Sequence, residues 1–331
     1  MEKFYNINMY EKLIEINHKK KFGSRFDDNH IFFYFKASDF KGLRDKKYEF
    51  SKKDGTILRG HFYNYSNYNK KDLIIFCHGF ASSHRSYFPE INQLCLNGYR
   101  VFAFDYKGTF ESDGENLGGF TEPIEDLYTL LNTFREQGYF KKYRISLVGH
   151  SWGGFAIGNV LNFIDDIYKA VIISGPTSSA DYLSGSMPKF MPFKAKAIES
   201  FLQKEAKIYP QFYDSTSLNA YKKTATKVLL VQSTDDPVVN FEYSSKIVKD
   251  VIGDKDNLEY YFINHHSHNP TYTNEASTYF NKVFNEYYNE IKHHKLKTIG
   301  EKKNYFKNVD WEKMTEIDHV VMNRIIDFLQ S

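Results

Sequence analysis

Apolar and polar residues alternate in blocks along most of this chain. Continuous apolar runs predict strands that are buried on both faces of a sheet, at residues 73–77, 100–105, 143–148, 170–174, 227–232 and 259–263. Helical periodicity marks the segments between or after them, at residues 89–97, 122–137, 194–208, 273–293 and 310–329. A turn at Lys53-Asp54-Gly55 predicts a hairpin of two more strands, residues 47–51 and 58–63. The alternation predicts an α/β protein with a mostly parallel central sheet and helices on both faces.

The alternation is interrupted between Gly175 and Lys227. About 50 residues there lack a buried-strand signal, which is too long for an ordinary connection. We interpret residues 176–226 as a helical lid inserted after the sixth strand, with a long structured surface loop as the alternative. Some of its side chains suggest an apolar acyl pocket, although a plain lid core would explain them equally well: Phe190, Met191, Phe193 and Phe201.

The rest of the chain divides around this insertion. We expect a core in two parts, residues 47–175 and 227–293, preceded by a polar and aromatic N-terminal extension, residues 1–46. Residues 294–331 are expected to form a polar linker and a last amphipathic helix. The apolar stripe of that helix is predicted at Val320, Val321, Ile325, Ile326 and Leu329.

The strongest chemical signal is the sequence Gly149-His-Ser-Trp-Gly153 between an apolar strand and a small-residue helix. This pattern predicts a nucleophile elbow, in which two glycines allow a strand and a helix to pack around a strained serine. Ser151 would then expose its hydroxyl at a helix N-terminus, where backbone N–H groups face developing negative charge. We therefore predict that Ser151 is a nucleophile.

An acyl-transfer site also needs donors for the oxyanion and a carboxylate that orients the base. Trp152 follows the nucleophile and is expected to supply one backbone N–H. The loop after the early strand, Cys77-His-Gly-Phe80, is expected to supply the other from Phe80. Asp236 follows the strand at residues 227–232 and is favoured as the acid, with Asp235 as the alternative.

Three histidines in the loop after the last predicted strand are candidates for the general base. His268 is favoured because a loop of about four residues from the strand end reaches the serine, with His266 second and His265 third. These histidines lack a nearby cysteine or further carboxylate at metal-ligand spacing, so we predict no metal. His84 and Arg85 follow the oxyanion loop and could contact a polar substrate group, although solvated loop residues are the favoured interpretation.

Residues 39–289 resemble the α/β-hydrolase superfamily, most closely the bacterial serine hydrolases described as lysophospholipase-like or serine-aminopeptidase-like. The resemblance is carried by residues 73–80, 101–114, 148–154, 235–239 and 267–269. The chain order Ser151, Asp236, His268 also matches the order of that superfamily. Two residues depart from the usual D-x-R-G-x-G-x-S segment, because Lys107 replaces the arginine and Phe110 the second glycine.

The resemblance implies an α/β-hydrolase fold and a serine hydrolase without a cofactor. We expect a carboxylic ester hydrolase that acts on a small-molecule acyl substrate through an acyl-enzyme on Ser151. A thioesterase, a serine aminopeptidase or an acyltransferase would use the same three residues, and a non-catalytic binding protein of the same fold is the alternative from another class.

Composition excludes several other classes. The 331 residues carry a formal charge of only +3 and no basic stripe interleaved with stacking aromatics, so nucleic acid is not an expected partner. The two cysteines, Cys77 and Cys95, lie in apolar surroundings and do not form a disulfide framework. With no apolar leader and no run of about 18 apolar residues, no transmembrane segment is predicted and the cytoplasm is the expected location. The oligomeric state is not predicted.

Overall fold

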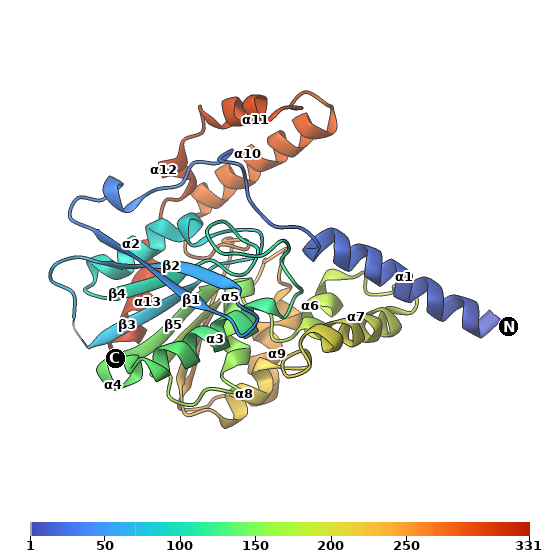
Figure 1. Ribbon diagram of the computed structural model, residues 1–331, viewed down its shortest axis with the longest axis horizontal. Coiled ribbons are helices and arrows are strands. Elements are labelled where there is room, and N and C mark those ends of the chain that lie inside the picture. The colour runs from blue at the N-terminus through green and yellow to red at the C-terminus, as the bar shows by residue number, and fades with distance from the viewer. Residues whose placement is uncertain (1, 70) are drawn as a thin grey trace.

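The computed structural model describes residues 2–69 and 71–331, which contain an eight-stranded sheet at the centre of the molecule (Figure 1). The strand order is β1-β2-β4-β3-β5-β6-β7-β8. β1 and β2 form the predicted hairpin, β2 is also antiparallel to β4, and all other neighbours are parallel. The strands are β1 Arg44–Ser51, β2 Ile57–Asn64, β3 Asp72–Cys77, β4 Arg100–Phe104, β5 Arg144–His150, β6 Lys169–Ile173, β7 Lys227–Ser233 and β8 Leu258–Ile263.

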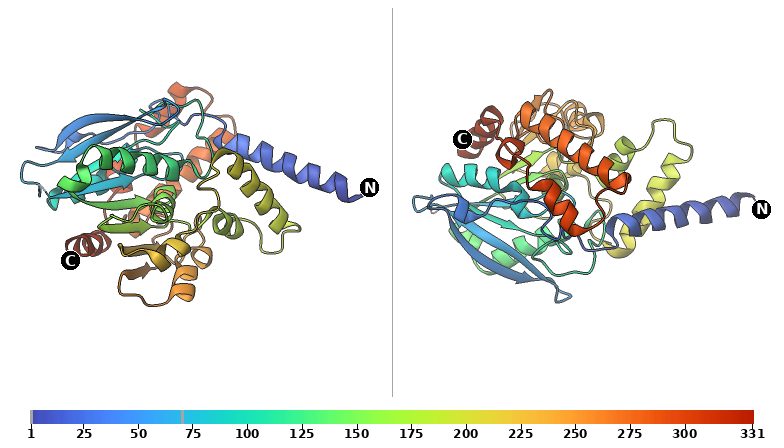
Figure 2. Two further views of the ribbon diagram at one scale, coloured as in Figure 1. Left: turned by 60° about the horizontal axis from the view of Figure 1, so that its bottom comes forward. Right: turned by 90° about the horizontal axis from the view of Figure 1, so that it is seen from above.

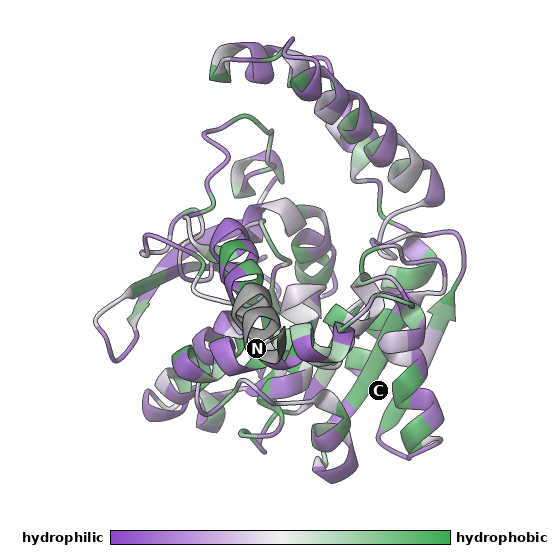
Figure 3. Ribbon diagram, turned by 90° about the vertical axis from the view of Figure 1, so that its right-hand side faces the viewer, coloured by the Kyte–Doolittle hydropathy of each residue, from purple (hydrophilic) through white to green (hydrophobic). Residues whose placement is uncertain are grey.

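Helices cover both faces of the sheet, as the alternating pattern predicts. Every residue of β3 is buried, and its side chains alternate between two cores. Leu73 and Ile75 face one core with α3 and α5, whereas Ile74 and Phe76 face the other with α2 and α13. Apolar residues accordingly concentrate in the strands (Figure 3). These helices are α2 Phe88–Leu96, α3 Glu122–Glu136, α5 Trp152–Val160 and α13 His319–Gln330.

The remaining helices lie in the connections and at the two ends of the chain. They are α1 Glu2–Phe22, α4 Tyr139–Lys142, α6 Ser179–Ser186, α7 Lys194–Ile208, α8 Ser217–Lys223, α9 Ser245–Ile252, α10 Asn274–Lys292, α11 Ile299–Phe306 and α12 Trp311–Met314, with 3₁₀ turns at η1 Ala37–Asp39, η2 His84–Tyr87 and η3 Phe241–Tyr243. Among the described helices, none has the length and hydropathy needed to cross a bilayer.

The C-terminal part differs from the sequence expectation in two places. The expected polar linker contains α11, which begins at a capping box of Thr298 and Glu301. The expected single last helix is divided into α12 and α13 because residues 315–318 pair with another segment. The Asp318 N–H donates to the Thr271 carbonyl, and the Asp318 carboxylate then caps α13. The predicted stripe of α13 is buried except Val320, which is 71% exposed.

The inserted segment, residues 176–226, is helical and lies beside the N-terminal helix. α1 and α7 run next to each other in both views of Figure 2. Buried polar contacts attach them, because His18 lies 2.7 Å from the Glu205 carboxylate, which also accepts the backbone N–H of Thr121. The N-terminal helix is therefore docked on the insertion rather than on the sheet.

Candidate active site

Ser151 stands at the sharp turn between β5 and α5 that the sequence predicts. Its backbone has φ 55° and ψ −115°, a conformation that costs a non-glycine residue roughly 1–3 kcal/mol and is typical of functional sites. The neighbouring glycines permit the turn. A Cβ on Gly153 would lie 2.1 Å from the Cys77 carbonyl oxygen, and one on Gly149 would lie 2.7 Å from Ile157. The serine is thus held in a strained position by close backbone packing.

Three residues from distant parts of the chain meet at this turn. His268 Nε2 lies 2.9 Å from Ser151 Oγ, and His268 Nδ1 lies 3.0 and 2.9 Å from the two carboxylate oxygens of Asp236. A carboxylate only accepts hydrogen bonds, so Nδ1 carries the proton and Nε2 is free to accept the serine hydroxyl. This is the arrangement in which an imidazole can remove the proton of Ser151.

Asp236 is itself fixed by its surroundings. Its side chain is fully buried, and Oδ1 accepts the backbone N–H groups of Val238 and Val239 at 2.9 Å each. Gln232 lies at hydrogen-bond distance from Oδ2. These donors leave the carboxylate with one orientation, which faces His268.

The alternative acid and bases lie elsewhere. Asp235 is exposed and accepts a hydrogen bond from the Ser233 hydroxyl. His266 Nε2 lies 2.9 Å from the Asp318 carboxylate, at the start of α13, and its Nδ1 contacts the Asn264 carbonyl oxygen. His265 is exposed and has φ 65°. Among the candidates that the sequence left open, the structure brings Asp236 and His268 to Ser151 and not the others.

The loop that bears the predicted oxyanion donors lies against Ser151. A Cβ on Gly79 would lie 3.5 Å from Ser151 Cβ, which places the Gly79–Phe80 backbone beside the serine. Trp152 is the first residue of α5. Among the described residues, the backbone N–H groups of Phe80 and Trp152 have no acceptor in the protein. Both are therefore available to an oxygen next to Ser151.

The neutral imidazole of His78 holds this loop in place through two hydrogen bonds. Its Nδ1 donates to the Gly79 carbonyl at 2.8 Å, and its Nε2 accepts the Tyr106 N–H at 3.2 Å. Burial lowers the pKa of His78 to about 4. The residue is therefore a structural support of the oxyanion loop, as its position in the motif indicates.

His150 connects the loop at Gly79 and Phe80 with the loop that bears His268. Its Nε2 donates to the His268 carbonyl at 2.7 Å, and its Nδ1 accepts the Tyr87 hydroxyl at 2.8 Å. The Tyr87 oxygen in turn accepts the Gly79 N–H at 3.0 Å. Burial, followed by the neighbouring His268, lowers the pKa of His150 to about 3, so the ring stays neutral. This chain of hydrogen bonds fixes the position of His268 relative to the oxyanion loop.

A cavity of about 630 Å³ opens onto Ser151 and His268. Its walls come mainly from two segments outside the sheet, the N-terminal residues 26–35 and the helices α10 and α12. The aromatic and aliphatic residues among them are Phe26, Ile31, Phe32, Phe33, Tyr34, Phe35, Phe280, Phe284, Tyr287, Tyr288, Ile291, Trp311 and Met314. The cavity is therefore largely apolar and adjoins the nucleophile.

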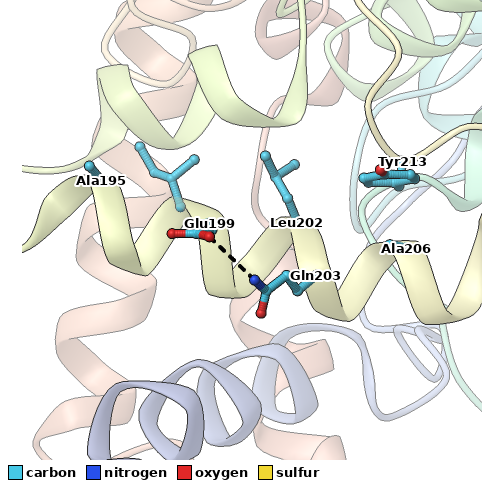
Figure 4. Close-up of a pocket in the computed structure, with 7 residues that line it drawn as sticks. Ala195, Glu199, Leu202, Gln203, Ala206 and Tyr213 are labelled. Carbon is cyan, nitrogen blue, oxygen red and sulfur yellow. Dashed lines mark hydrogen bonds between the residues drawn. The ribbon is translucent and has the colours of Figure 1, made fainter. Parts of the chain in front are cut away.

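The sequence left the lid side chains open between an acyl pocket and a plain lid core, and they do not contribute to the cavity at Ser151. Of the described residues in 176–226, none lines the cavity at Ser151. Phe190 is 90% exposed, and Phe201 is buried against His18 of α1. A separate hollow on the insertion is lined by α7 and Tyr213 alone (Figure 4). The Phe-rich run at residues 31–35 was the sequence signal for the actual wall.

His84 and Arg85 are not the solvated pair that the sequence favoured. His84 is 1% exposed and its Nδ1 lies 2.9 Å from the Asp105 carboxylate. Arg85 lines the cavity and donates to the Glu111 carboxylate. Only Arg85 is thus placed to meet a substrate.

Known proteins resemble this chain in sequence over its central part. The family model of the S33 serine aminopeptidases matches residues 68–214. An uncharacterized 31.7 kDa protein of Escherichia coli is 37% identical over 89 residues, which are 26% of this chain and 30% of that protein. An epoxide hydrolase of Caballeronia sordidicola is 32% identical over 103 residues, 30% of this chain and 29% of that enzyme. The chain thus matches less than a third of the length of these curated relatives.

Solved structures match over a longer stretch. An esterase of Pyrococcus furiosus covers 79% of this chain with 96% of its own, at a TM-score of 0.55 and 19% identity. An acylaminoacyl peptidase of Pyrococcus horikoshii covers 75% of this chain with 42% of its own, at a TM-score of 0.53 and 15% identity. The strand order, the elbow and these structural matches show that the chain has the α/β-hydrolase fold.

Proposed function

We propose that this protein is a serine hydrolase that cleaves carboxylic esters through an acyl-enzyme on Ser151. The observation that carries the proposal is the position of His268, which is within hydrogen-bond distance of Ser151 through one ring nitrogen and of Asp236 through the other. A binding protein of the same fold has no need for this arrangement, which favours a catalyst.

The reaction follows from these contacts. His268 Nε2 removes the hydroxyl proton as Ser151 Oγ attacks the acyl carbon, and the negative carbonyl oxygen is bound by the free N–H groups of Phe80 and Trp152. Asp236 stabilises the imidazolium that forms. His268 then gives the proton to the leaving alcohol, whose bond to carbon breaks. Water attacks the acyl-enzyme with His268 as base, which releases the acid and restores Ser151.

The cavity favours an ester with an apolar acyl or alcohol group. Its wall is dominated by aromatic side chains, and the carboxylate of Asp28, which also lines it, already accepts the backbone N–H groups of His30 and Phe32. A serine aminopeptidase is the second candidate because that family model matches residues 68–214. An aminopeptidase would need a free carboxylate to bind the ammonium group of its substrate. The Asp28 carboxylate already accepts two backbone N–H groups, so it would bind that ammonium group less well than an unpaired carboxylate.

A fluorophosphonate probe tests the proposal. The probe phosphonylates a serine only where a base and an oxyanion site activate it, so we expect rapid labelling of the wild-type protein and none of Ser151→Ala. Ser267→Ala, which removes another hydroxyl of the same region, should label like the wild type. Equal labelling of wild type and Ser151→Ala, or failure of the folded wild type to label at all, would refute the proposal.

The apolar cavity predicts a preference for long acyl chains. We expect kcat/KM for p-nitrophenyl esters to rise with chain length, and Phe284→Ala to reduce this gain by roughly tenfold because about 1–2 kcal/mol of apolar contact is lost. Phe190→Ala, which alters an exposed ring of the insertion, should leave the chain-length profile unchanged. If Phe190→Ala reduced the gain with chain length and Phe284→Ala did not, the acyl chain would lie at the insertion instead.

A further inference from the structure

A cluster of two buried histidines and a half-buried glutamate has no part in the proposed reaction. His61 comes from β2, His84 from η2 and Glu111 from the loop after β4. Each offers one ligand atom, and these atoms lie within 4.8 Å of one another. The side chains of His61 and His84 are only 5% and 1% exposed. Three separate segments thus converge on one enclosed point.

Both histidines are oriented by a carboxylate on the far side of the ring. His61 Nδ1 lies 2.5 Å from Asp45, and His84 Nδ1 lies 2.9 Å from Asp105. The Asp105 carboxylate holds a proton on His84 Nδ1 and leaves a lone pair on His84 Nε2, which is the usual support of a metal-binding histidine. His61 lies between two carboxylates, so it carries a proton on each nitrogen until a metal displaces the one on Nε2. His61 Nε2 faces Glu111 Oε2 at 3.0 Å. The two Nε2 atoms and Glu111 are therefore the candidate ligands.

The remaining nitrogen of His84 points to a missing partner. His84 Nε2 is buried and has no hydrogen-bond partner among the described residues. An unpaired buried polar atom is costly, and a ligand at this point would remove the cost. A cation is compatible with the charges, because three carboxylates surround the two histidines, those of Asp45, Asp105 and Glu111, and of these Glu111 is paired with Arg85.

A cluster of three carboxylates elsewhere in the protein differs from the histidine cluster, because a lysine fills its centre. Glu122, Glu125 and Asp126 also bring three oxygen atoms together, but Lys52 already occupies their centre. Its ammonium group lies 2.6 Å from Glu125 and 2.7 Å from Asp126. That cluster is a complete ion-pair network, whereas in the histidine cluster the buried His84 Nε2 has no partner among the described residues.

We propose that His61, His84 and Glu111 bind one divalent transition-metal ion of the zinc type. Two imidazole nitrogens and one carboxylate oxygen suit Zn²⁺ better than Mg²⁺ or Ca²⁺, and a water would complete the tetrahedron. Metal–ligand bonds of about 2.1 Å place ligand atoms about 3.4 Å apart, so small side-chain shifts suffice to bring the three atoms, which lie within 4.8 Å of one another, around one ion. Binding displaces the proton shared by His61 and Glu111. The ion would attach the segment after Phe80 to β2.

Metal titration of the full-length protein, stripped with a chelator and free of any affinity tag, tests this site. We expect one Zn²⁺ per chain by calorimetry, a rise in Tm with added Zn²⁺, and the visible absorption of a four-coordinate complex with Co²⁺. Glu111→Gln should weaken Zn²⁺ binding by ~100-fold, and Asp45→Asn, which leaves all three ligands in place, by ~10-fold. His293→Ala, an exposed histidine of another region, should bind as the wild type does.

Two results would overturn the proposal. One is a folded wild-type protein that takes up no Zn²⁺ and shows no change in Tm. The other is a Glu111→Gln variant that binds as tightly as the wild type while circular dichroism shows both to be folded. Because each readout is binding rather than ester hydrolysis, neither result depends on the reaction proposed for Ser151.

Discussion

His268→Ala is expected to lower kcat for ester hydrolysis by on the order of 10⁴-fold, whereas His266→Ala changes it by less than about twofold. The two residues lie in one loop and differ in what they contact. His268 touches Ser151 and Asp236, and His266 touches the Asp318 carboxylate. Steady-state kinetics on a p-nitrophenyl ester measures both. KM should change little, because neither ring is a major part of the apolar cavity wall.

The comparison is valid only if the His266→Ala and His268→Ala variants are folded to the same extent. His266→Ala removes one contact to Asp318, but the backbone N–H groups of Val320 and Val321 still bond that carboxylate, so α13 keeps its cap. Thermal unfolding of both variants checks this point. A loss in His266→Ala comparable to that in His268→Ala, at equal Tm, would contradict the assignment of the base.

Gly153→Ala is expected to destabilise the protein by at least about 3 kcal/mol and to abolish activity. The new methyl group would lie 2.1 Å from the Cys77 carbonyl oxygen and 2.8 Å from that of His78, and both are backbone atoms that cannot rotate away. Relief requires α5 to move off β3, which would displace Ser151 and the Trp152 N–H together. Urea denaturation gives the change in the free energy of unfolding.

Gly300→Ala is the matched control for this substitution. Gly300 lies in α11, and its nearest neighbour to an added Cβ is 3.9 Å away. The change should therefore stay within about 0.5 kcal/mol of the wild type. A Gly153→Ala protein as stable as Gly300→Ala would mean that the elbow is looser than the packing distances indicate.

Much of the fold was predictable because its signals are local. Strands buried on both faces appear as continuous apolar runs, and the predicted strands of the sheet are all confirmed within a residue or a few. Pro123 lies in the first turn of α3, and Gly138, with φ 80°, follows its end, so both boundaries of this helix carry ordinary local signals. The division between α12 and α13 was not predictable, since it depends on backbone pairing with residues 271–273 far away in the sequence.

The site was predictable to the extent that it depends on strand ends. Ser151, Asp236 and the histidine loop each follow a parallel strand, and parallel strands present such loops at one edge of the sheet. Their contact is now visible, and their catalytic role stays a prediction. Loop length favours His268 over His266 in the sequence, but only the ring directions in the structure show which of them contacts Ser151 and Asp236. The histidine cluster was not predictable from the sequence, because its members lie far apart in the chain, on β2, on η2 and in a loop.

The sheet and the outer segments of the chain contribute different parts of the candidate site, and this separation has a consequence for evolution. The three residues proposed for catalysis follow strands of the sheet, while much of the aromatic wall of the cavity comes from residues 26–35 and from α10 and α12. Substitutions in those outer segments alter which molecules enter without disturbing the serine, the imidazole or the carboxylate. Selection can therefore change which substrates the cavity accepts by altering these outer segments, while the residues proposed for catalysis stay the same.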